Sequence, residues 1–524
     1  MNRALCNSCK EIAPAECVER AGKIYLVKNC PKCGSTETLI SADAKRYNNK
    51  RSLDTGFEYR NCHLSCLSCK HTKPPSIVFV DITNRCNMNC PICLNNTPSD
   101  GFFFEPPLEY FEKIFKHFST YPSPPAMQLF GGEPLVRDDF LEIVELAKSY
   151  GLRPRVVTNG LRLADEEYCR KVVETRIKIL FAYDGANPRL YRNLRGSETA
   201  MHLKQKGLDN IQKVGGGRVT LMTVLSKDYN ADELPDFFRF CHDRRDHIGS
   251  IYFLPLAHVW DPDEWDYSPE QMTTEDLELL VDQAFPDDYI EFLPAGLLGN
   301  LRTLMRCLRV KNLPFMGAHP NCESIYLMIS DGQEYVPFTR YLKGSPIEAA
   351  RSLIEAEQRL AGRVQKLDAG RFGRWLERVE LKEKFLYLMG IRALGGVLKR
   401  HVRLGLLLKG KGLGKIYHGL AAPLQLAFGR KSRTVLERHT TVQGMLEVLA
   451  LPIEDPTNIE TDRMERCPSA FTYYDPKKDQ VRTVPFCTWN TMYRKRALRE
   501  VAEHYGTAQR EVPVERKIRI RAEA

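Results

Sequence analysis

Three cysteines in one short segment, Cys86, Cys90 and Cys93, have the spacing of iron–sulfur ligands. Their CxxxCxxC frame follows an apolar run at 76–82, which is typical of a β-strand. Three thiolates can hold three irons of a [4Fe–4S] cluster and leave the fourth iron without a protein ligand. An iron with an open position can bind a reactant, so we interpret these cysteines as catalytic metal ligands.

Two more motifs follow this frame, each at the end of a predicted strand. The segment Gly131-Gly132-Glu133-Pro134 comes after an apolar run at 126–130, and Thr158-Asn159-Gly160 ends the next run, 153–158. Paired glycines let the backbone approach a neighbour closely. Together with the cysteine frame, these motifs resemble the radical S-adenosylmethionine (SAM) enzymes.

This resemblance implies reductive cleavage of SAM to a 5′-deoxyadenosyl radical, which removes hydrogen from an unactivated carbon. It also implies a small electron donor of the ferredoxin or flavodoxin type. Glu133 or its neighbouring carbonyls would accept hydrogen bonds from the methionine ammonium of SAM. The apolar side chain of Ile92 would lie near the adenine. The expected SAM-binding residues are Gly131, Gly132, Glu133, Pro134, Thr158 and Asn159.

A second CxxxCxxC frame, Cys62-Cys66-Cys69, precedes the first one. It has Ser68 where the first frame has Ile92, and no strand-like run comes before it. We therefore predict that it holds an auxiliary [4Fe–4S] cluster, with a structural metal knuckle as the alternative.

Two CxxC knuckles near the start, with Cys6, Cys9, Cys30 and Cys33, supply four thiolates for one tetrahedral ion. Spacing does not decide between zinc and iron, or between a structural site and an electron relay. Four later cysteines would form a second auxiliary cluster or else pack in the core: Cys307, Cys322, Cys467 and Cys487. Cys169 and Cys241 lie in helix-like segments and are expected to be packing residues.

The elements that must position these residues start at residue 77, where short apolar runs alternate with amphipathic segments. Strands are expected at 77–82, 126–130, 153–158, 177–182, 218–224 and 250–255, and helices at 108–119, 138–150, 165–175, 199–214 and 231–244. Parallel barrels have their chemistry at the carboxyl ends of the strands. We therefore predict an α/β fold with a partial (β/α)6 TIM-like barrel.

Six regions are expected along the chain. A rubredoxin- or zinc-ribbon-like module (1–60) and an auxiliary iron–sulfur segment (61–76) precede the barrel core (77–290). A substrate and cluster segment (291–345), a basic amphipathic helical region (346–440) and a C-terminal α-rich cluster region (441–524) follow it. Asp184 and Gly185, after the fourth strand, are either on the substrate side or in an ordinary loop. Arg192 and Arg195, in the next loop, either meet an anionic group or are solvated.

Composition indicates a globular protein of several units, with 524 residues, 43% apolar and 27% charged. Eleven of the 17 cysteines come before residue 94, which favours metal binding in a reducing compartment over disulfides. The start has no apolar signal segment and no run of apolar residues is long enough to span a membrane, so a cytoplasmic protein is expected.

The net charge of +10 is local, because residues 384–434 contain eleven Lys and Arg and no Asp or Glu. On a helical wheel one face is apolar (Ile391, Leu394, Val397, Leu398 and Val402) and the other basic (Arg392, Lys399, Arg400 and Arg403). This pattern indicates peripheral contact with an anionic membrane surface. A basic surface packed on the barrel is the alternative, and nucleic acid is not expected because few aromatics are interleaved.

The order of the cysteine groups, ending in Pro485-Phe486-Cys487, resembles the archaeal tetraether lipid synthases. That resemblance implies a rubredoxin-type iron, three [4Fe–4S] clusters and coupling of inert lipid-chain carbons. One expected cysteine is replaced by Ser76, so the auxiliary cluster would take His71, Ser76 or Cys17, or keep an open iron. We therefore expect a radical SAM enzyme acting on a membrane lipid. The alternatives are modification of a pterin or peptide and, remotely, a non-catalytic zinc-ribbon interaction protein.

Overall fold

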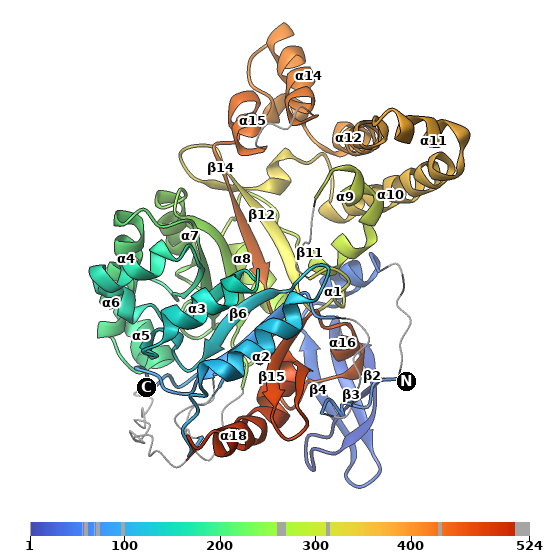
Figure 1. Ribbon diagram of the computed structural model, residues 1–524. Helices are drawn as coiled ribbons and strands as arrows, with labels where there is room; N and C mark the ends of the chain where they lie inside the picture. The colour runs from blue at the N-terminus through green and yellow to red at the C-terminus, as the bar shows by residue number, and fades with distance from the viewer. Residues whose placement is uncertain are drawn as a thin grey trace.

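The computed structural model describes residues 2–54, 56, 61–67, 69, 74–95, 100–258, 269–310, 315–427 and 432–508. Ser68 and His71, which bear on the expected auxiliary cluster, lie outside the described residues. Two sheets and a group of helices make up the molecule (Figure 1). Among the described residues, no helix has the length and apolar character needed to cross a membrane.

The N-terminal domain is an antiparallel four-stranded sheet followed by one helix. Its strands pair in chain order: β1 (Arg3–Leu5), β2 (Ile12–Arg20), β3 (Lys23–Cys30) and β4 (Gly34–Ser41). Helix α1 (Ala44–Arg51) connects it to α8 (Thr274–Gln283) of the main body. The Lys50 ammonium, fully buried, lies 2.7 Å from the carboxylates of both Glu275 and Glu278. Because a buried charge must be paired, this contact holds the domain against the main body.

All six predicted strands are confirmed, and they pair in chain order as one parallel sheet. They are β5 (Ile77–Thr83), β6 (Ala126–Gly131), β7 (Pro154–Thr158), β8 (Lys178–Ala182), β9 (Val219–Leu225) and β10 (Ile248–Pro255). The five predicted helices are also confirmed: α2 (Leu108–Ser119), α3 (Phe140–Ser149), α4 (Glu166–Glu174), α6 (Thr199–Lys213) and α7 (Leu234–Asp243). Apolar faces of these helices pack on the sheet, with Phe111, Phe115 and Ile143 fully buried. The carboxyl ends of the strands therefore share one edge.

The segment that we predicted as a loop, with Arg192 and Arg195, forms α5 (Pro188–Arg195). Asn187 caps its first turn and Gly196, in the left-handed conformation, ends it. The helix is only eight residues long, so its periodic signal in the sequence is weak.

The large sheet extends well beyond the expected barrel boundary at residue 290. On one side β10 pairs with β14 (Gly444–Ala450), which pairs with β12 (Ser324–Ser330) and so leads to β11 (Leu293–Pro294), while β13 (Tyr335–Pro337) also pairs with β12. On the other side β5 pairs with β15 (Ser469–Asp475), which pairs with β16 (Gln480–Pro485).

The C-terminal region is therefore mixed, whereas we expected it to be α-rich. Beside its three strands it has α16 (Thr461–Arg466), α17 (Phe486–Thr488), a single π-helical turn (Trp489–Tyr493) and α18 (Arg494–His504). The edge strands β5 and β10 need pairing partners, and strands far along the chain provide them.

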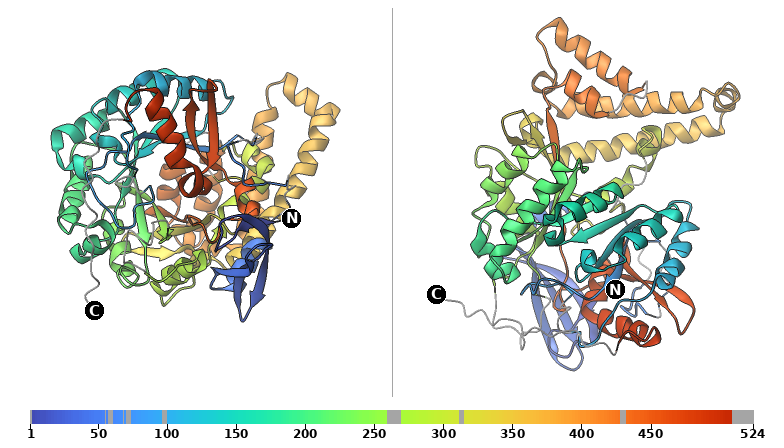
Figure 2. Two further views of the ribbon diagram at one scale, coloured as in Figure 1. Left: turned by 90° about the horizontal axis from the view of Figure 1, so that it is seen from below. Right: turned by 60° about the vertical axis from the view of Figure 1, so that its left-hand side comes forward.

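Helices from Pro346 to His439 form a lobe that stands away from both sheets (Figures 1 and 2). This helical lobe contains α10 (Pro346–Ala369), α11 (Arg371–Arg378), α12 (Lys382–His401), α13 (Leu404–Leu407), α14 (Leu413–Ala427) and α15 (Ser432–His439). These helices lie within the region 346–440 that we expected to be basic, amphipathic and helical.

The apolar face that we assigned to membrane contact, however, turns largely inward. Leu394 packs against a buried cluster that includes Leu360 of α10 and Cys307 of α9 (Arg302–Cys307), and Val402 is buried. A second helix thus covers the face that a helical wheel shows as free.

Candidate functional site

The three predicted catalytic cysteines lie in the loop that leaves the carboxyl end of β5. Cys86 is accessible from solvent, and Cys90 and Cys93 are half-buried. Desolvation by the surrounding protein raises the pKa of Cys86 well above its usual value, and the neighbouring Cys90 thiol adds to this effect. Cys86, Cys90 and Cys93 thus lie close enough to interact, and in the thiolate form their mutual repulsion would be relieved by a bound cation or cluster.

Gly131 and Gly132 lie directly against the backbone that leads into this loop. A Cβ atom at Gly131 would lie 2.2 Å from the Thr83 carbonyl oxygen, and one at Gly132 would lie 2.1 Å from that of Arg85. Gly131 also has a φ of 130°, which L-residues rarely adopt. The close approach that requires glycine is thus made to the segment just before Cys86.

Glu133 joins the end of β6 to the end of β7. It is almost fully buried, and its Oε1 accepts hydrogen bonds from Thr158 Oγ1 at 2.7 Å and from the Leu135 N–H at 3.0 Å. Its Oε2 accepts from the Asn159 N–H at 2.6 Å. Burial raises the pKa of Glu133, and these hydrogen bonds oppose that rise. Three of the roughly four acceptor positions of the carboxylate are thus used, and both Oε2 and the backbone carbonyls around Pro134 stay candidates to accept from the expected ammonium.

Asn159 extends from β7 back to the cysteine loop. Its Nδ2 donates to Asn87 Oδ1 at 2.8 Å and lies 3.9 Å from Cys86 Sγ. The Asn159 carbonyl accepts from Lys204 Nζ of α6 at 2.7 Å. Burial, with the charge of Arg195 beside it, lowers the pKa of Lys204 to about 8. Sequence reasoning missed this lysine because one lysine in an amphipathic helix has the pattern of a solvated residue.

Asp184 and Arg195 form a buried pair at the same edge of the sheet. Two of the three Arg195 guanidinium nitrogens, Nε and Nη2, donate to the Asp184 carboxylate at 2.7 Å. Arg195 also lowers the pKa of Cys90, although burial raises it overall. Arg192, in contrast, is exposed and pairs with Glu198 at 2.7 Å. Of the two alternatives for these arginines, Arg195 meets an anion, and that anion is Asp184.

Ile92, which we expected near an adenine, is buried in a small cluster with Leu194 and Leu256. Cys169 and Cys241 are fully buried in the main core, so the prediction that they are packing residues is confirmed.

The second cysteine frame lies against the C-terminal segment. The Cys66 N–H donates to Tyr493 Oη at 3.3 Å, and its Sγ lies 3.5 Å from Thr488 Oγ1. Cys62 packs against the apolar cluster that contains Cys487, and Cys69 is exposed. The segment 486–493 thus forms one wall of the predicted auxiliary site.

Two residues that we considered as a fourth ligand have other partners. Ser76 Oγ donates to the Pro468 carbonyl at 3.4 Å. Cys17 lies in the N-terminal domain, where its Sγ is 3.7 Å from Tyr47 Oη and 3.8 Å from Glu460 Oε2. Burial raises the pKa of Cys17 to about 12.

Among the four late cysteines, Cys467 lies near both Cys322 and Cys487. Burial raises the pKa of Cys322 and of Cys487, and the Cys467 thiol adds to both shifts. The Glu454 N–H donates to Cys487 Sγ at 3.4 Å, and Cys467 Sγ donates to the Ser469 carbonyl at 3.1 Å.

Cys307 does not belong to this group. It lies on α9 in the apolar cluster that α10 and α12 complete, with Leu304, Leu360 and Leu386. Cys307 is therefore separated from the region where Cys467 lies near Cys322 and Cys487, and a cluster held by the late cysteines stays a prediction.

The first four cysteines have the geometry of a site for one ion. The sulfur atoms of Cys6, Cys9, Cys30 and Cys33 all lie within 4.8 Å of one another. Hydrogen bonds from the backbone N–H groups of Cys9 and Ser8 lower the pKa of Cys6 to about 6, which favours the thiolate that a metal binds. Among the described residues only this group has single-ion spacing. The Cys86, Cys90 and Cys93 thiols are more widely spaced, as fits a cluster in which each thiolate binds a different iron.

Comparisons with known proteins assign two parts of the chain. Residues 80–241 match the model of the radical SAM superfamily, and residues 2–42 match the HMPTM N-terminal zinc ribbon domain. A 7,8-dihydro-6-hydroxymethylpterin dimethyltransferase from Methanocaldococcus jannaschii is 26% identical over 518 residues, which cover 96% of this chain and 95% of that protein. A probable GTP 3′,8-cyclase from Methanothermobacter thermautotrophicus is 30% identical over 196 residues, or 37% of this chain and 62% of its own length.

Among solved structures, Streptococcus suis SuiB bound to S-adenosylmethionine has a TM-score of 0.30 and 15% identity, covering 40% of this chain and 46% of that one.

Proposed function

Because the chain carries a radical SAM domain and an N-terminal zinc ribbon, we propose that it cleaves SAM reductively and abstracts hydrogen from an unactivated carbon. The observation that supports this most directly is the connection of three loops at one edge of the sheet. Glu133 joins the second loop to the third, and Asn159 joins the third to the cysteine loop. Such preorganised loops hold a reactant in one orientation.

Within this proposal Cys86, Cys90 and Cys93 hold three irons of a [4Fe–4S] cluster, which when bound supplies the electron that cleaves SAM. The backbone around Pro134 and the Asn159 side chain orient the methionine and ribose parts of SAM. Lys204 places a positive charge beside the loops, where a carboxylate would bind. The other cysteine groups, Cys62/Cys66/Cys69 and Cys322/Cys467/Cys487, hold auxiliary clusters, and the N-terminal four hold one zinc or iron ion.

The first candidate substrate is a pterin. The relative that aligns with 96% of this chain is named for its action on 7,8-dihydro-6-hydroxymethylpterin. Since that alignment includes regions far outside the SAM site, it supports a related substrate more strongly than the cyclase match, which covers 37%.

The second candidate is an alkyl chain of a membrane lipid, as the resemblance to the tetraether lipid synthases implies. One observation favours it: the helical lobe exposes Leu413, Ile416 and Leu420 beside a segment free of acidic residues. A pterin enzyme has no need of such a surface.

Anaerobically reconstituted protein, reduced with dithionite and given SAM, would distinguish these substrates. One sample receives 7,8-dihydro-6-hydroxymethylpterin, one extracted lipids and one neither, and 5′-deoxyadenosine is measured by mass spectrometry. We expect stimulation by the pterin with a mass increase in it, and loss of all product in Cys90→Ala. Cys169→Ala, a buried cysteine outside the loop, is the control. If only lipid stimulated 5′-deoxyadenosine formation, the second candidate substrate would replace the pterin. If every cysteine site held zinc and no 5′-deoxyadenosine formed, the proposal that the protein is a radical SAM enzyme would be wrong.

A further inference from the structure

Helix α14 exposes an apolar stripe that nothing in the described structure covers. Leu413, Ile416, Tyr417 and Leu420 are exposed by 83%, 58%, 57% and 65%, more than any other large hydrophobic side chain of the described residues. The last three residues follow Leu413 by three, four and seven positions, which places all four side chains on one face of the helix. A contiguous exposed apolar patch of this kind marks an interaction surface.

The exposed apolar side chains are concentrated in the helical lobe. Of the 17 large hydrophobic side chains exposed among the described residues, eleven lie between Phe372 and Leu420. The main body, by contrast, exposes few of them. Most of the exposed apolar surface of the described residues therefore lies on the lobe.

The charge around the stripe identifies the class of partner. No Asp or Glu occurs from Lys384 to Thr434, and Lys411 and Lys415 flank the start of the stripe. An amphipathic helix with lysines beside its apolar face lies in the interface of an anionic bilayer, and each basic residue near such a surface adds to binding. Tyr417 suits this position because tyrosine prefers the boundary between headgroups and acyl chains.

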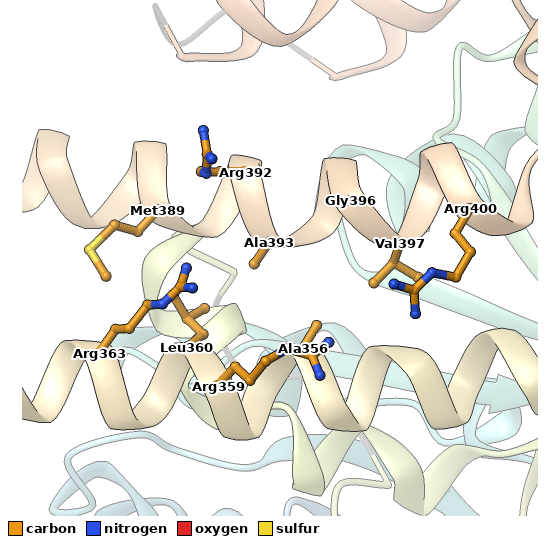
Figure 3. Close-up of a pocket in the computed structure, with 10 residues that line it drawn as sticks. All are labelled: Ala356, Arg359, Leu360, Arg363, Met389, Arg392, Ala393, Gly396, Val397 and Arg400. Atoms are coloured by element: carbon orange, nitrogen blue, oxygen red, sulfur yellow. The ribbon is translucent and has the colours of Figure 1, made fainter.

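A second feature of the lobe fits the headgroups of the same membrane. The groove between α10 and α12 has a volume of about 220 Å³ and is lined by Arg359, Arg363, Arg392 and Arg400 around an apolar floor of Ala356, Leu360, Met389, Ala393 and Val397 (Figure 3). Figure 3 shows Arg363 and Arg400 extending into the space between the helices, whereas Arg392 extends away from α10. Arg359 pairs only with exposed Glu355 at 3.5 Å.

In the part of the chain that the structure describes, the other three arginines have no ion-pair partner. Of these, Arg363 and Arg400 extend into the groove (Figure 3), and two guanidinium groups without a carboxylate partner are suited to phosphate. Helix α14 contacts α12, so the groove and the stripe belong to the same lobe.

We propose that the helical lobe docks on an anionic phospholipid bilayer, with the α14 stripe in the interface and the α10–α12 groove holding a lipid phosphate. Helix α14 has 15 residues, about 22 Å, which is too short to span the hydrocarbon core, so it lies on the surface. A second copy of the chain is a poorer partner, because a symmetric contact would bring two basic surfaces together. The proposal does not depend on which substrate the enzyme takes.

Sedimentation of the full-length protein with vesicles tests the proposal. We expect binding to vesicles of phosphatidylcholine with 30% phosphatidylglycerol, about tenfold weaker binding to phosphatidylcholine alone, and a further loss at high salt. The triple variant Leu413→Ser/Ile416→Ser/Leu420→Ser should lose at least about tenfold in the partition coefficient. Its control is Ile12→Ser/Val310→Ser, which removes exposed apolar side chains elsewhere.

The double variant Arg363→Gln/Arg400→Gln tests the groove against Arg153→Gln/Arg239→Gln, which removes the same charge from the main body. If the two double variants lost vesicle binding to the same extent, the groove would not be a phosphate site. The membrane proposal would be overturned if the wild type bound neither kind of vesicle. It would also be overturned if light scattering showed a dimer that the triple variant abolishes while vesicle binding stays unchanged. Circular dichroism and 5′-deoxyadenosine formation verify that each variant is folded.

Discussion

The carboxylate of Glu133 accepts a hydrogen bond from the backbone N–H of Asn159 at 2.6 Å, and this contact joins the loop after β6 to the loop after β7. Asn159 in turn donates to Asn87, between Cys86 and Cys90. The position of the cysteine loop therefore depends on a buried carboxylate that need not touch a reactant.

Replacing Glu133 tests this dependence. Glu133→Ala leaves three donors without an acceptor, from Thr158, Leu135 and Asn159, and should lower the free energy of unfolding by about 2–4 kcal/mol. SAM affinity should fall as well, while Glu145→Ala, at an exposed carboxylate, should change neither. Urea unfolding and calorimetric titration with SAM measure both quantities. A Glu133→Ala protein as stable as the wild type would mean that the three hydrogen bonds do not hold the loops.

The buried pair Asp184–Arg195 should be sensitive to loss of either partner. Asp184→Asn leaves the Arg195 charge uncompensated and should cost about 3–5 kcal/mol of unfolding free energy. Arg195→Lys loses the two-point contact and should also destabilise. Arg192→Lys on the same helix, at an exposed pair, should cost under about 0.5 kcal/mol. Equal effects of the two arginine substitutions in thermal unfolding would contradict the structure.

Gly132 has no room for a side chain. In Gly132→Ala the new Cβ would meet the Arg85 carbonyl oxygen at 2.1 Å, so the backbone before Cys86 must shift. We expect a loss of 5′-deoxyadenosine formation of about tenfold or more, since small displacements of a reacting group are costly. Gly217→Ala is the matched control. Apart from its chain neighbours, no atom of the described residues lies within 4 Å of a Cβ added at Gly217. Unchanged product formation in Gly132→Ala would show that the loop tolerates the shift.

The four N-terminal cysteines should hold one metal ion that stabilises their domain. Cys9→Ser should remove about one equivalent of zinc or iron, measured by inductively coupled plasma mass spectrometry, and lower the unfolding temperature of the N-terminal domain. Cys17 lies in the same domain, but its thiol hydrogen-bonds with Tyr47 and Glu460, so the Cys17→Ser variant should keep the metal. Equal metal content in wild type and Cys9→Ser would refute the site.

Local sequence determined the six parallel strands, their five helices and the cysteine loop after the first strand. Apolar periodicity repeats within a few residues, and CxxxCxxC spacing is complete within eight, so both can be recognised without knowledge of the fold. Each CxxC knuckle of the N-terminal site can likewise be recognised locally, whereas the pairing of the N-terminal strands brings the four sulfur atoms within 4.8 Å of one another.

Tertiary structure alone decided which distant segments complete the site and the sheet. The pairing of β10 with β14 joins Ile251 to Val448, and the buried Lys204 reaches Asn159 from another helix. The same applies to the exclusion of Cys307 from the late cysteines and to the inward turn of Leu394. Such contacts depend on which faces the packed elements bury against each other, and a pattern confined to one segment contains no information about its partner.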